Sequence, residues 1–149
     1  MIIADDREKK NAHVLKYFSD NGHSFTVRRM DVADYMIEGA PGIVVDRKQN
    51  LEEIAQNLAT VDRGRFYREM RRAYASGVKM YVLCEHGKDI RSIPDVAAWH
   101  SRFSAISGRI LMDRMISCEM AYGVKFLFCS KGETGKKILD ILGGNIDVQ

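Results

Sequence analysis

The alternation of short apolar runs with helical apolar stripes predicts the elements of this chain and their order. Apolar or β-branched runs with the period of a strand lie at residues 1–4, 24–30, 35–37, 43–45, 78–84 and 124–129. Helical spacing of apolar residues, together with start and stop signals, predicts helices at residues 10–20, 50–58, 65–75, 94–103, 108–122 and 135–142. The order β-α-β-β-β-α-α-β-α-α-β-α is typical of an α/β domain with a mixed sheet.

Local signals support several of these helices. Asn50 stands where it can cap the helix that follows the fourth strand. Pro94 suits the first turn of the predicted helix 94–103. In that helix Trp99 and Phe103 lie at i and i+4, a spacing that indicates core residues rather than a platform for stacking bases.

The stretch around residues 31–53 carries the most informative chemistry. Two strand-like runs, 35–37 and 43–45, flank a turn rich in Gly and Pro, which predicts a β-hairpin. A hairpin brings Asp34, before the first strand, beside Asp46 and Lys48 at the end of the second. Two carboxylates beside an amine can hold a divalent cation next to a cationic group, which suits hydrolysis of a phosphodiester.

Composition narrows the class of protein without identifying it. The chain has 149 residues, 46% hydrophobic and 29% charged, which predicts one folded domain with a substantial core. A net charge of +3 permits a nucleic-acid partner without requiring one. The three cysteines, Cys84, Cys118 and Cys129, are widely spaced in apolar surroundings, which indicates buried thiols rather than a zinc site or disulfides.

No apolar run approaches the roughly 20 residues of a membrane span, and the N-terminus has no signal-peptide pattern. We therefore expect an intracellular protein, in the cytoplasm if it is bacterial or from a phage and in the nucleus if it is eukaryotic.

Short motifs follow one another along roughly the first 90 residues in a specific order. In sequence they are Asp5-Asp6-Arg7-Glu8, Ala33-Asp34-Tyr35, Val45-Asp46-Arg47-Lys48 followed by Glu52, Gly64-Arg65-Phe66, and Val82-Leu83-Cys84-Glu85. This set resembles the nuclease domain of the XPF-type structure-specific endonucleases, within the restriction-endonuclease-like PD-(D/E)XK superfamily. The family has DxRE or DxxE first, then Gly-Asp-aromatic, V-E-R-K-x-x-x-D and G-R-[FL], and its next strand tends to end in an acid.

The resemblance implies an α/β, restriction-endonuclease-like three-layer sandwich, with a central mixed sheet flanked by helices. The chain departs from the family pattern at Ala33, where the family has Gly, and at Asp46 and Glu52, where it has Glu and Asp. The last two keep the charge but move it by one methylene. Full-length members usually add a helix-hairpin-helix region, and we expect residues 1–149 to form a single nuclease domain without one.

The candidate catalytic residues are Asp34, Asp46, Lys48, Asp5 and Glu8. Asp34 and Asp46, with Asp5 in addition, are the candidate ligands of Mg²⁺, for which Mn²⁺ can substitute. Because Asp46 and Lys48 are two residues apart on a strand, they point to the same face. The ammonium of Lys48 can orient the attacking water or stabilise the charge of the phosphorane.

Four further residues are candidates for supporting the site, namely Arg7, Arg47, Glu52 and Glu85. Arg47 points away from Asp46 in the strand. By resemblance it supports the site or contacts phosphate, whereas a purely structural interpretation pairs it with an acid. Taken singly, the candidate residues other than Asp46 and Lys48 favour an ordinary structural interpretation, whereas the combination favours a metal site.

A row of arginines in the predicted helix 65–75 forms the second candidate feature. Arg65, Arg68 and Arg72 recur at i, i+3 and i+7 and are the candidate DNA-binding residues. A solvated helix face paired with Glu69 and other acids is an equally good interpretation.

The favoured function is a metal-dependent endonuclease that hydrolyses phosphodiester bonds and leaves a 5′-phosphate, with branched, flap or fork DNA as substrate by resemblance. The first alternative is a catalytically silent DNA-binding or dimerisation partner of the same fold. A recombination or restriction nuclease of the same superfamily is a further alternative. The compact length suggests a phage or prophage protein, or one domain of a longer chain.

Family nuclease domains commonly dimerise through the C-terminal half. The resemblance therefore implies a homodimer or heterodimer through the helices at residues 108–122 and 135–142. Met112, Met115 and Met120 are assigned either to the core or to such a dimer face.

Overall fold

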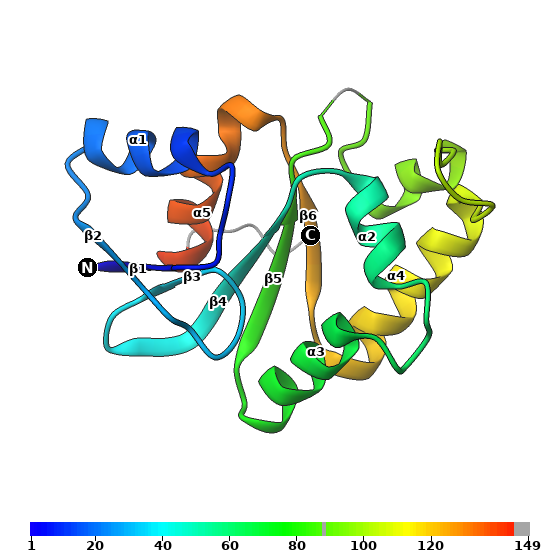
Figure 1. Ribbon diagram of the computed structural model, residues 1–149, viewed down its shortest axis with the longest axis horizontal. Helices are drawn as coiled ribbons and strands as arrows, with labels where there is room; N and C mark the ends of the chain where they lie inside the picture. The colour runs from blue at the N-terminus through cyan, green and yellow to red at the C-terminus, as the bar shows by residue number, and fades with distance from the viewer. Residues whose placement is uncertain (88, 145–149) are drawn as a thin grey trace.

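A six-stranded sheet with helices on both faces forms the framework of the protein (Figure 1). The computed structural model describes residues 1–87 and 89–144. The strands are β1 (Ile2–Asp5), β2 (Phe25–Arg28), β3 (Tyr35–Ile37), β4 (Ala40–Lys48), β5 (Lys79–Cys84) and β6 (Lys125–Phe128). The helices are α1 (Ala12–Asp20), α2 (Leu51–Asn57), α3 (Arg65–Ala75), η1 (Ile93–Ala98), α4 (Gly108–Tyr122), η2 (Lys131–Glu133) and α5 (Thr134–Leu142), where η1 and η2 are 3₁₀-helices.

The sheet is mixed, with the order β2-β1-β3-β4-β5-β6. β3 is antiparallel to β1 and β4, whereas the pairs β1–β2, β4–β5 and β5–β6 are parallel. Tyr35 pairs with Val45 across the hairpin, and Asp46 and Lys48 pair with Val82 and Cys84 of β5. The end of β4 therefore lies in the middle of the sheet, next to the start of β3.

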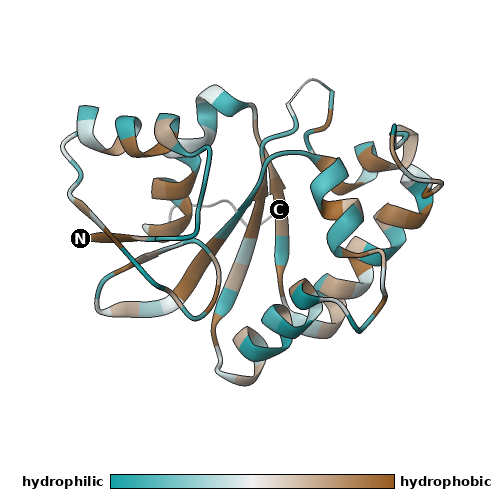
Figure 2. Cartoon of the chain, in the orientation of Figure 1, coloured by the Kyte–Doolittle hydropathy of each residue, from teal (hydrophilic) through white to brown (hydrophobic). Residues whose placement is uncertain are grey.

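The two faces of the sheet bury separate hydrophobic clusters, which makes the fold three-layered. One cluster joins α2, α3, η1 and α4 to the sheet through residues such as Ile54, Met70 and Leu111. The other joins α1 and α5 to the opposite face through residues such as Phe18 and Ile138. Figure 2 shows hydrophobic colours along the central strands and mixed bands on the helices, as expected when each helix buries one side.

The predicted α/β class, the mixed sheet and the order of elements are confirmed. Asn50 caps α2, because its side-chain oxygen accepts a hydrogen bond from the backbone N–H of Glu53 at 2.9 Å. The three cysteines are buried and free. The hairpin has a tighter turn than predicted, and β4 continues through Asp46 to Lys48, so the acidic end of the hairpin is itself part of the strand.

The predicted helix 94–103 is wrong in its second half. The 3₁₀-helix η1 ends at Ala98, and Trp99 already has an extended backbone, with φ −77° and ψ 149°. The hydroxyl of Ser101 accepts hydrogen bonds from the backbone N–H groups of Phe103 and Ser104 at 3.1 and 3.0 Å. These local bonds replace helical ones, and they leave Phe103 79% exposed rather than in the predicted core.

Gly108 begins α4 where that helix packs tightly against η1. A Cβ atom at this position would lie 2.1 Å from the carbonyl oxygen of Val96 and 2.5 Å from that of Trp99. Because both obstacles are backbone atoms, we expect Gly108→Ala to lower the free energy of unfolding by about 2–3 kcal/mol. Urea denaturation measures the change. The matched control is Gly132→Ala, which meets nothing within 4 Å, and an equal loss in both variants would contradict this description.

Across residues 1–87 and 89–144, no helix combines the length and apolar character needed to cross a membrane.

Candidate active site

The alternation of side chains along β4 places residues 44–48 on the two faces of the sheet. Val44 belongs to the cluster under α2 and α3, whereas Val45 belongs to the cluster under α1 and α5. By the same alternation Asp46 and Lys48 point toward α2 and α3, and Arg47 points toward α1 and α5. All three are buried, although they are charged. A row of buried charges in a central strand indicates a functional site rather than a stabilising feature.

The hairpin places Asp34 on the same face as Asp46. The backbone N–H of Asp34 donates to the carbonyl oxygen of Val45 at 2.9 Å, and Asp34 Oδ2 accepts from the backbone N–H of Arg47 at 2.8 Å. The preceding residue, Ala33, adopts a left-handed backbone with φ 63°, a conformation that favours Gly. The predicted approach of Asp34 to Asp46 and Lys48 is therefore present in the structure.

These side chains line a cleft of about 630 Å³, here called the acidic cleft. Lys48 Nζ lies 3.0 Å from Asp46 Oδ2 and 4.3 Å from the ring centroid of Phe66. Burial alone would lower the pKa of Lys48, but the ion pair with Asp46 and the negative charges of Glu53 and Asp34 together outweigh it and leave that pKa above its ordinary value. Lys48 is thus a charged ammonium that can donate hydrogen bonds and attract a phosphate, and it does not serve as a base.

Asp34 has an environment that opposes its ionisation. Burial, with the negative charges of Asp46 and Glu8, raises the pKa of Asp34 well above its ordinary value. The N–H of Arg47 acts in the opposite direction without cancelling this effect. The charge of Asp46 thus opposes the ionisation of Asp34, and a divalent cation would relieve this repulsion.

The donor set of the acidic cleft fits a small, hard cation. Asp46 Oδ2 is buried, and its contact with Lys48 is an ion pair without the alignment of a hydrogen bond. Within the part of the chain that the structure describes, this oxygen accepts no hydrogen bond. The same is true of the side-chain oxygen Oδ1 of Asn57, a residue that also lines the cleft. Among the described residues no three His, Cys, Asp or Glu side chains converge into a ready-made metal site. Mg²⁺ typically binds one or two carboxylates and keeps several waters, so Asp34 and Asp46 fit it as a pair.

Asp5 lines the cleft, but both of its oxygens are already engaged. Its carboxylate accepts hydrogen bonds from Arg7 Nε at 3.0 Å and from the backbone N–H of Met30 at 2.8 Å. Burial favours the neutral acid, but these bonds prevail and lower the pKa of Asp5. Arg7 also donates to the carbonyl oxygen of Met30 at 2.6 Å. The pair therefore holds the segment before Asp34 against β1.

Arg47 is enclosed by acids on the opposite face of the sheet. Its guanidinium donates to Glu8 at 2.7 Å, to Glu85 at 2.6 Å and to the carbonyl oxygen of Lys9 at 2.6 Å. Glu85 also bonds to His13 at 2.6 Å and accepts from the Thr134 hydroxyl at 2.5 Å. Of the two interpretations of Arg47, the structure shows the pairing with acids, which anchors the backbone of β4 beneath Asp46 and Lys48.

The structure separates some predicted residues from the cleft. Glu52 points away from Asp46 and accepts hydrogen bonds from the Ser101 hydroxyl and the Arg102 N–H, both at 2.7 Å. Glu85 lies with Arg47 rather than in the cleft. Among the predicted arginines, Arg65 and Arg72 line the cleft. The third, Arg68, is exposed and donates to the carbonyl oxygen of Arg63 at 2.8 Å.

Four acids that were not predicted as site residues also line the cleft, namely Asp6, Asp31, Glu53 and Glu69. Glu69 accepts a hydrogen bond from the N–H of Ala33 at 3.2 Å, so α3 fixes the loop that carries Asp34. The sequence did contain a signal for it. Glu69 shares the apolar stripe of α3 with Phe66, Met70 and Ala73, all of which are buried, and an acid within such a stripe indicates a site.

Replacement of Glu69 by glutamine tests the electrostatics of the acidic cleft. Burial and the charge of Asp46 raise the pKa of Glu69, so its ionised form opposes folding near neutral pH. A nearby like charge costs on the order of 1 kcal/mol, and we expect Glu69→Gln to raise the free energy of unfolding by about that amount at pH 7. Urea denaturation in EDTA measures the change. Glu38→Gln, at an exposed turn, is the control, and a lower stability of Glu69→Gln would contradict the prediction.

Comparisons with known proteins support the similarity of this chain to one family. A sequence profile of the ERCC4 domain matches residues 4–141. No curated protein matches the chain in sequence. Two solved structures of XPF from Aeropyrum pernix align with TM-scores of 0.72 and 0.73, each at 18% identity, and the second is a complex with DNA. The alignments cover 95% and 99% of this chain and 62% and 68% of the archaeal chains.

At this identity the structural likeness shows the fold alone, and the chain spans less than two thirds of the first archaeal protein. These matches give no support to the suggested phage origin.

Proposed function

This chain belongs to the ERCC4 domain family, a family of structure-specific nucleases, and we propose that it is a metal-dependent DNA endonuclease. The predicted resemblance to XPF-type nuclease domains is confirmed by the family match and by the shared fold. The observation that carries the proposal is the acidic cleft, where Asp34, Asp46 and Lys48 meet on one face of the sheet. We propose that residues 1–149 act as one nuclease domain, with branched, flap or fork DNA as the substrate.

Each residue of the cleft has a proposed task. Asp34 and Asp46 would hold Mg²⁺ or Mn²⁺, with Asp5 as the further candidate ligand. A bound divalent cation supplies a water of lowered pKa and offsets the charge of the scissile phosphate. The ammonium of Lys48 orients that water or stabilises the phosphate charge that develops during hydrolysis.

The remaining predicted residues would keep this arrangement in place. Glu8 and Glu85 bind Arg47 and so fix the strand that carries Asp46. Arg7 holds Asp5, and Glu52 holds the loop that contains Ser101. Glu8 also lines the acidic cleft, but its carboxylate accepts hydrogen bonds from Tyr35 and Arg47, which favours a positioning task.

DNA would approach across the rim of the cleft formed by α3. Arg65 and Arg72 line the cleft and offer guanidinium groups to phosphates, and Arg68 lies further out on the same helix. The archaeal XPF that shares the fold was solved with DNA, which supports a nucleic-acid partner. Arg72 also donates to the carbonyl oxygen of Asp31 at 3.3 Å, so part of its hydrogen-bonding capacity serves the fold.

A dimer through α4 and α5 is the proposed assembly. Ile110, Ile116 and Met120 on α4 are 45%, 38% and 83% exposed, whereas Met115 is buried in the core. Apolar side chains exposed along one helix suit a partner surface.

Cleavage of labelled DNA separates the endonuclease from a silent DNA-binding partner. Flap, fork and blunt linear duplexes are incubated with the protein and Mg²⁺, Mn²⁺ or EDTA. We expect cutting of the branched substrates with either metal and none in EDTA. Tight binding to branched DNA without cutting under any metal would instead favour the silent partner.

A further inference from the structure

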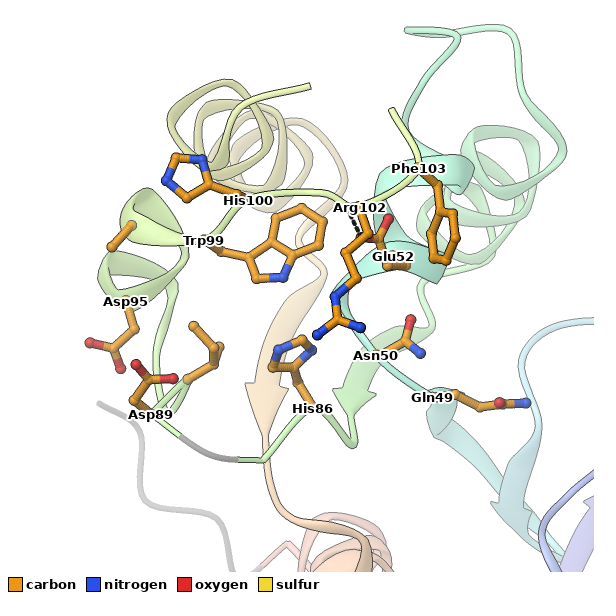
Figure 3. Close-up of a pocket in the computed structure, with 12 residues that line it drawn as sticks. Gln49, Asn50, Glu52, His86, Asp89, Asp95, Trp99, His100, Arg102 and Phe103 are labelled. Atoms are coloured by element: carbon orange, nitrogen blue, oxygen red, sulfur yellow. Dashed lines mark hydrogen bonds between the residues drawn. The ribbon is translucent and has the colours of Figure 1, made fainter. Parts of the chain in front are cut away.

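A second hollow of about 630 Å³ opens beside the acidic cleft, beyond the end of β4 (Figure 3). It is lined by Gln49, His86, Trp99, Arg102 and Phe103, and we call it the aromatic hollow. None of these residues takes part in the proposed metal chemistry. Figure 3 shows the indole of Trp99, the ring of His86 and the side chain of Arg102 facing a common space.

The aromatic hollow offers flat rings of the kind on which nucleobases stack. Trp99 packs partly against the core, and its ring meets that of His86 edge to face, with centroids 6.3 Å apart. Phe103 stands on the other side of Arg102 in Figure 3 and is 79% exposed. Proteins bind unpaired bases by stacking them on aromatic rings, with Arg side chains contributing.

Hydrogen bonds within the loop that contains Ser101 hold Phe103 in its exposed position. Glu52 accepts hydrogen bonds from the Ser101 hydroxyl and the Arg102 N–H, both at 2.7 Å. Ser101 in turn accepts from the N–H of Phe103 at 3.1 Å. An exposed aromatic ring loses the free energy of burial, so a loop that holds one outward suits contact with a ligand.

Arg102 places a positive charge in the aromatic hollow, whose lining also contains the carboxylates of Glu52, Asp89 and Asp95. The guanidinium of Arg102 makes no hydrogen bond or ion pair with the residues that the structure describes, and it lies between His86 and Asn50 in Figure 3. Two of the nearby acids are already engaged, since Glu52 and Asp95 accept hydrogen bonds from local backbone N–H groups. A free guanidinium beside aromatic rings matches the phosphate and base of one nucleotide.

The aromatic hollow and the acidic cleft share a wall. Gln49 directly follows Lys48 in the chain, and the neighbouring residues Glu52 and Glu53 of α2 line the hollow and the cleft, respectively. The start of α2 therefore forms the wall between the two.

We propose that the aromatic hollow binds an unpaired nucleotide of the DNA substrate, with its base on Trp99 and Phe103 and its phosphate at Arg102. The inference rests on the proposed function for its choice of DNA. It gives the preference for branched substrates a physical basis, because a blunt duplex has no unpaired base to offer.

Tryptophan fluorescence tests this proposal directly, since Trp99 is the only tryptophan of the chain. The full chain is titrated with oligothymidylate in EDTA, so that cleavage is not needed. We expect saturable quenching, which Phe103→Ala and Arg102→Ala each weaken by roughly 5- to 100-fold in apparent affinity. Tyr74→Ala, which removes a 61% exposed aromatic elsewhere, is the control and should bind like the parent protein.

Three outcomes would overturn the proposal: no quenching, quenching unaffected by either variant, and equal quenching by a blunt duplex or by an acidic peptide. The fluorescence result is independent of the proposed reaction. Saturable quenching without cleavage of any DNA would contradict the endonuclease and leave the aromatic hollow supported. Metal-dependent cleavage without quenching would support the endonuclease and contradict the role of the aromatic hollow.

Discussion

Replacement of Arg47 by methionine is expected to lower the free energy of unfolding by about 3–5 kcal/mol. The side chain of Arg47 is 1% exposed, and those of its partners Glu8 and Glu85 are 8% and 4% exposed. Methionine fills a similar volume but leaves both carboxylates buried without their cation. Removal of one partner from a buried ion network is therefore far more damaging than removal of the whole network. Chemical denaturation measures the loss.

Two further variants separate charge from packing. Addition of Glu8→Gln and Glu85→Gln to Arg47→Met should restore much of the stability, because the stranded charges disappear. Arg91→Met removes an arginine whose pair with Glu133 is on the surface, with both side chains more than half exposed, and should cost at most about 1 kcal/mol. Equal effects of Arg47→Met and Arg91→Met would show that the buried network does not anchor β4.

The second large effect is expected at Asp46. Asp46→Asn keeps the shape of the side chain but removes the charge that would hold the cation, so we expect DNA cleavage to fall by roughly 10³-fold. The fold should survive, because asparagine keeps the size of the side chain and relieves repulsion with Asp34 and Glu69. Lys48 loses its ion pair with Asp46 but keeps the nearby negative charges of Asp34 and Glu53. Single-turnover cleavage of a flap substrate at saturating Mg²⁺ measures the rate, and circular dichroism checks the fold.

Asp20→Asn makes the same chemical change on the exposed end of α1, where the carboxylate is 57% exposed, and should leave the rate unchanged. If Asp46→Asn cleaved as fast as Asp20→Asn, the acidic cleft would not be the reaction centre.

The features that the sequence could predict are those governed by short periods. The period of two along a strand places Asp46 and Lys48 on one face and Arg47 on the other, whatever the rest of the chain does. A hairpin joins the start of one strand to the end of the next, so the approach of Asp34 to Asp46 follows from the turn. These relations are local, and the structure contains them.

The features that the sequence could not predict depend on how the helices pack against the sheet. Glu52 and Glu53 are neighbours on α2, and only the rotation of that helix over the sheet decides which faces the acidic cleft. The motif placed Glu52 there, whereas the structure places Glu53. Glu8 and Glu85 belong to the first and the last of the sequence motifs, so their meeting at Arg47 also depends on how the elements pack.

Competition between a side chain and the backbone for hydrogen bonds explains why the predicted helix 94–103 is wrong in its second half. A spacing of four predicted that Trp99 and Phe103 share a buried helical face, yet Ser101 captures the N–H groups that such a helix would need. The hydrogen bonds to Ser101 that prevent this helix also hold Phe103 at the rim of the aromatic hollow.

Crystals soaked in Mn²⁺ test the central claim most directly, because anomalous scattering locates the ion without reference to activity. The proposed reaction predicts a strong anomalous peak within coordinating distance of the Asp34 and Asp46 carboxylates, and its disappearance in Asp46→Asn. No peak between these two carboxylates at saturating Mn²⁺ would contradict it.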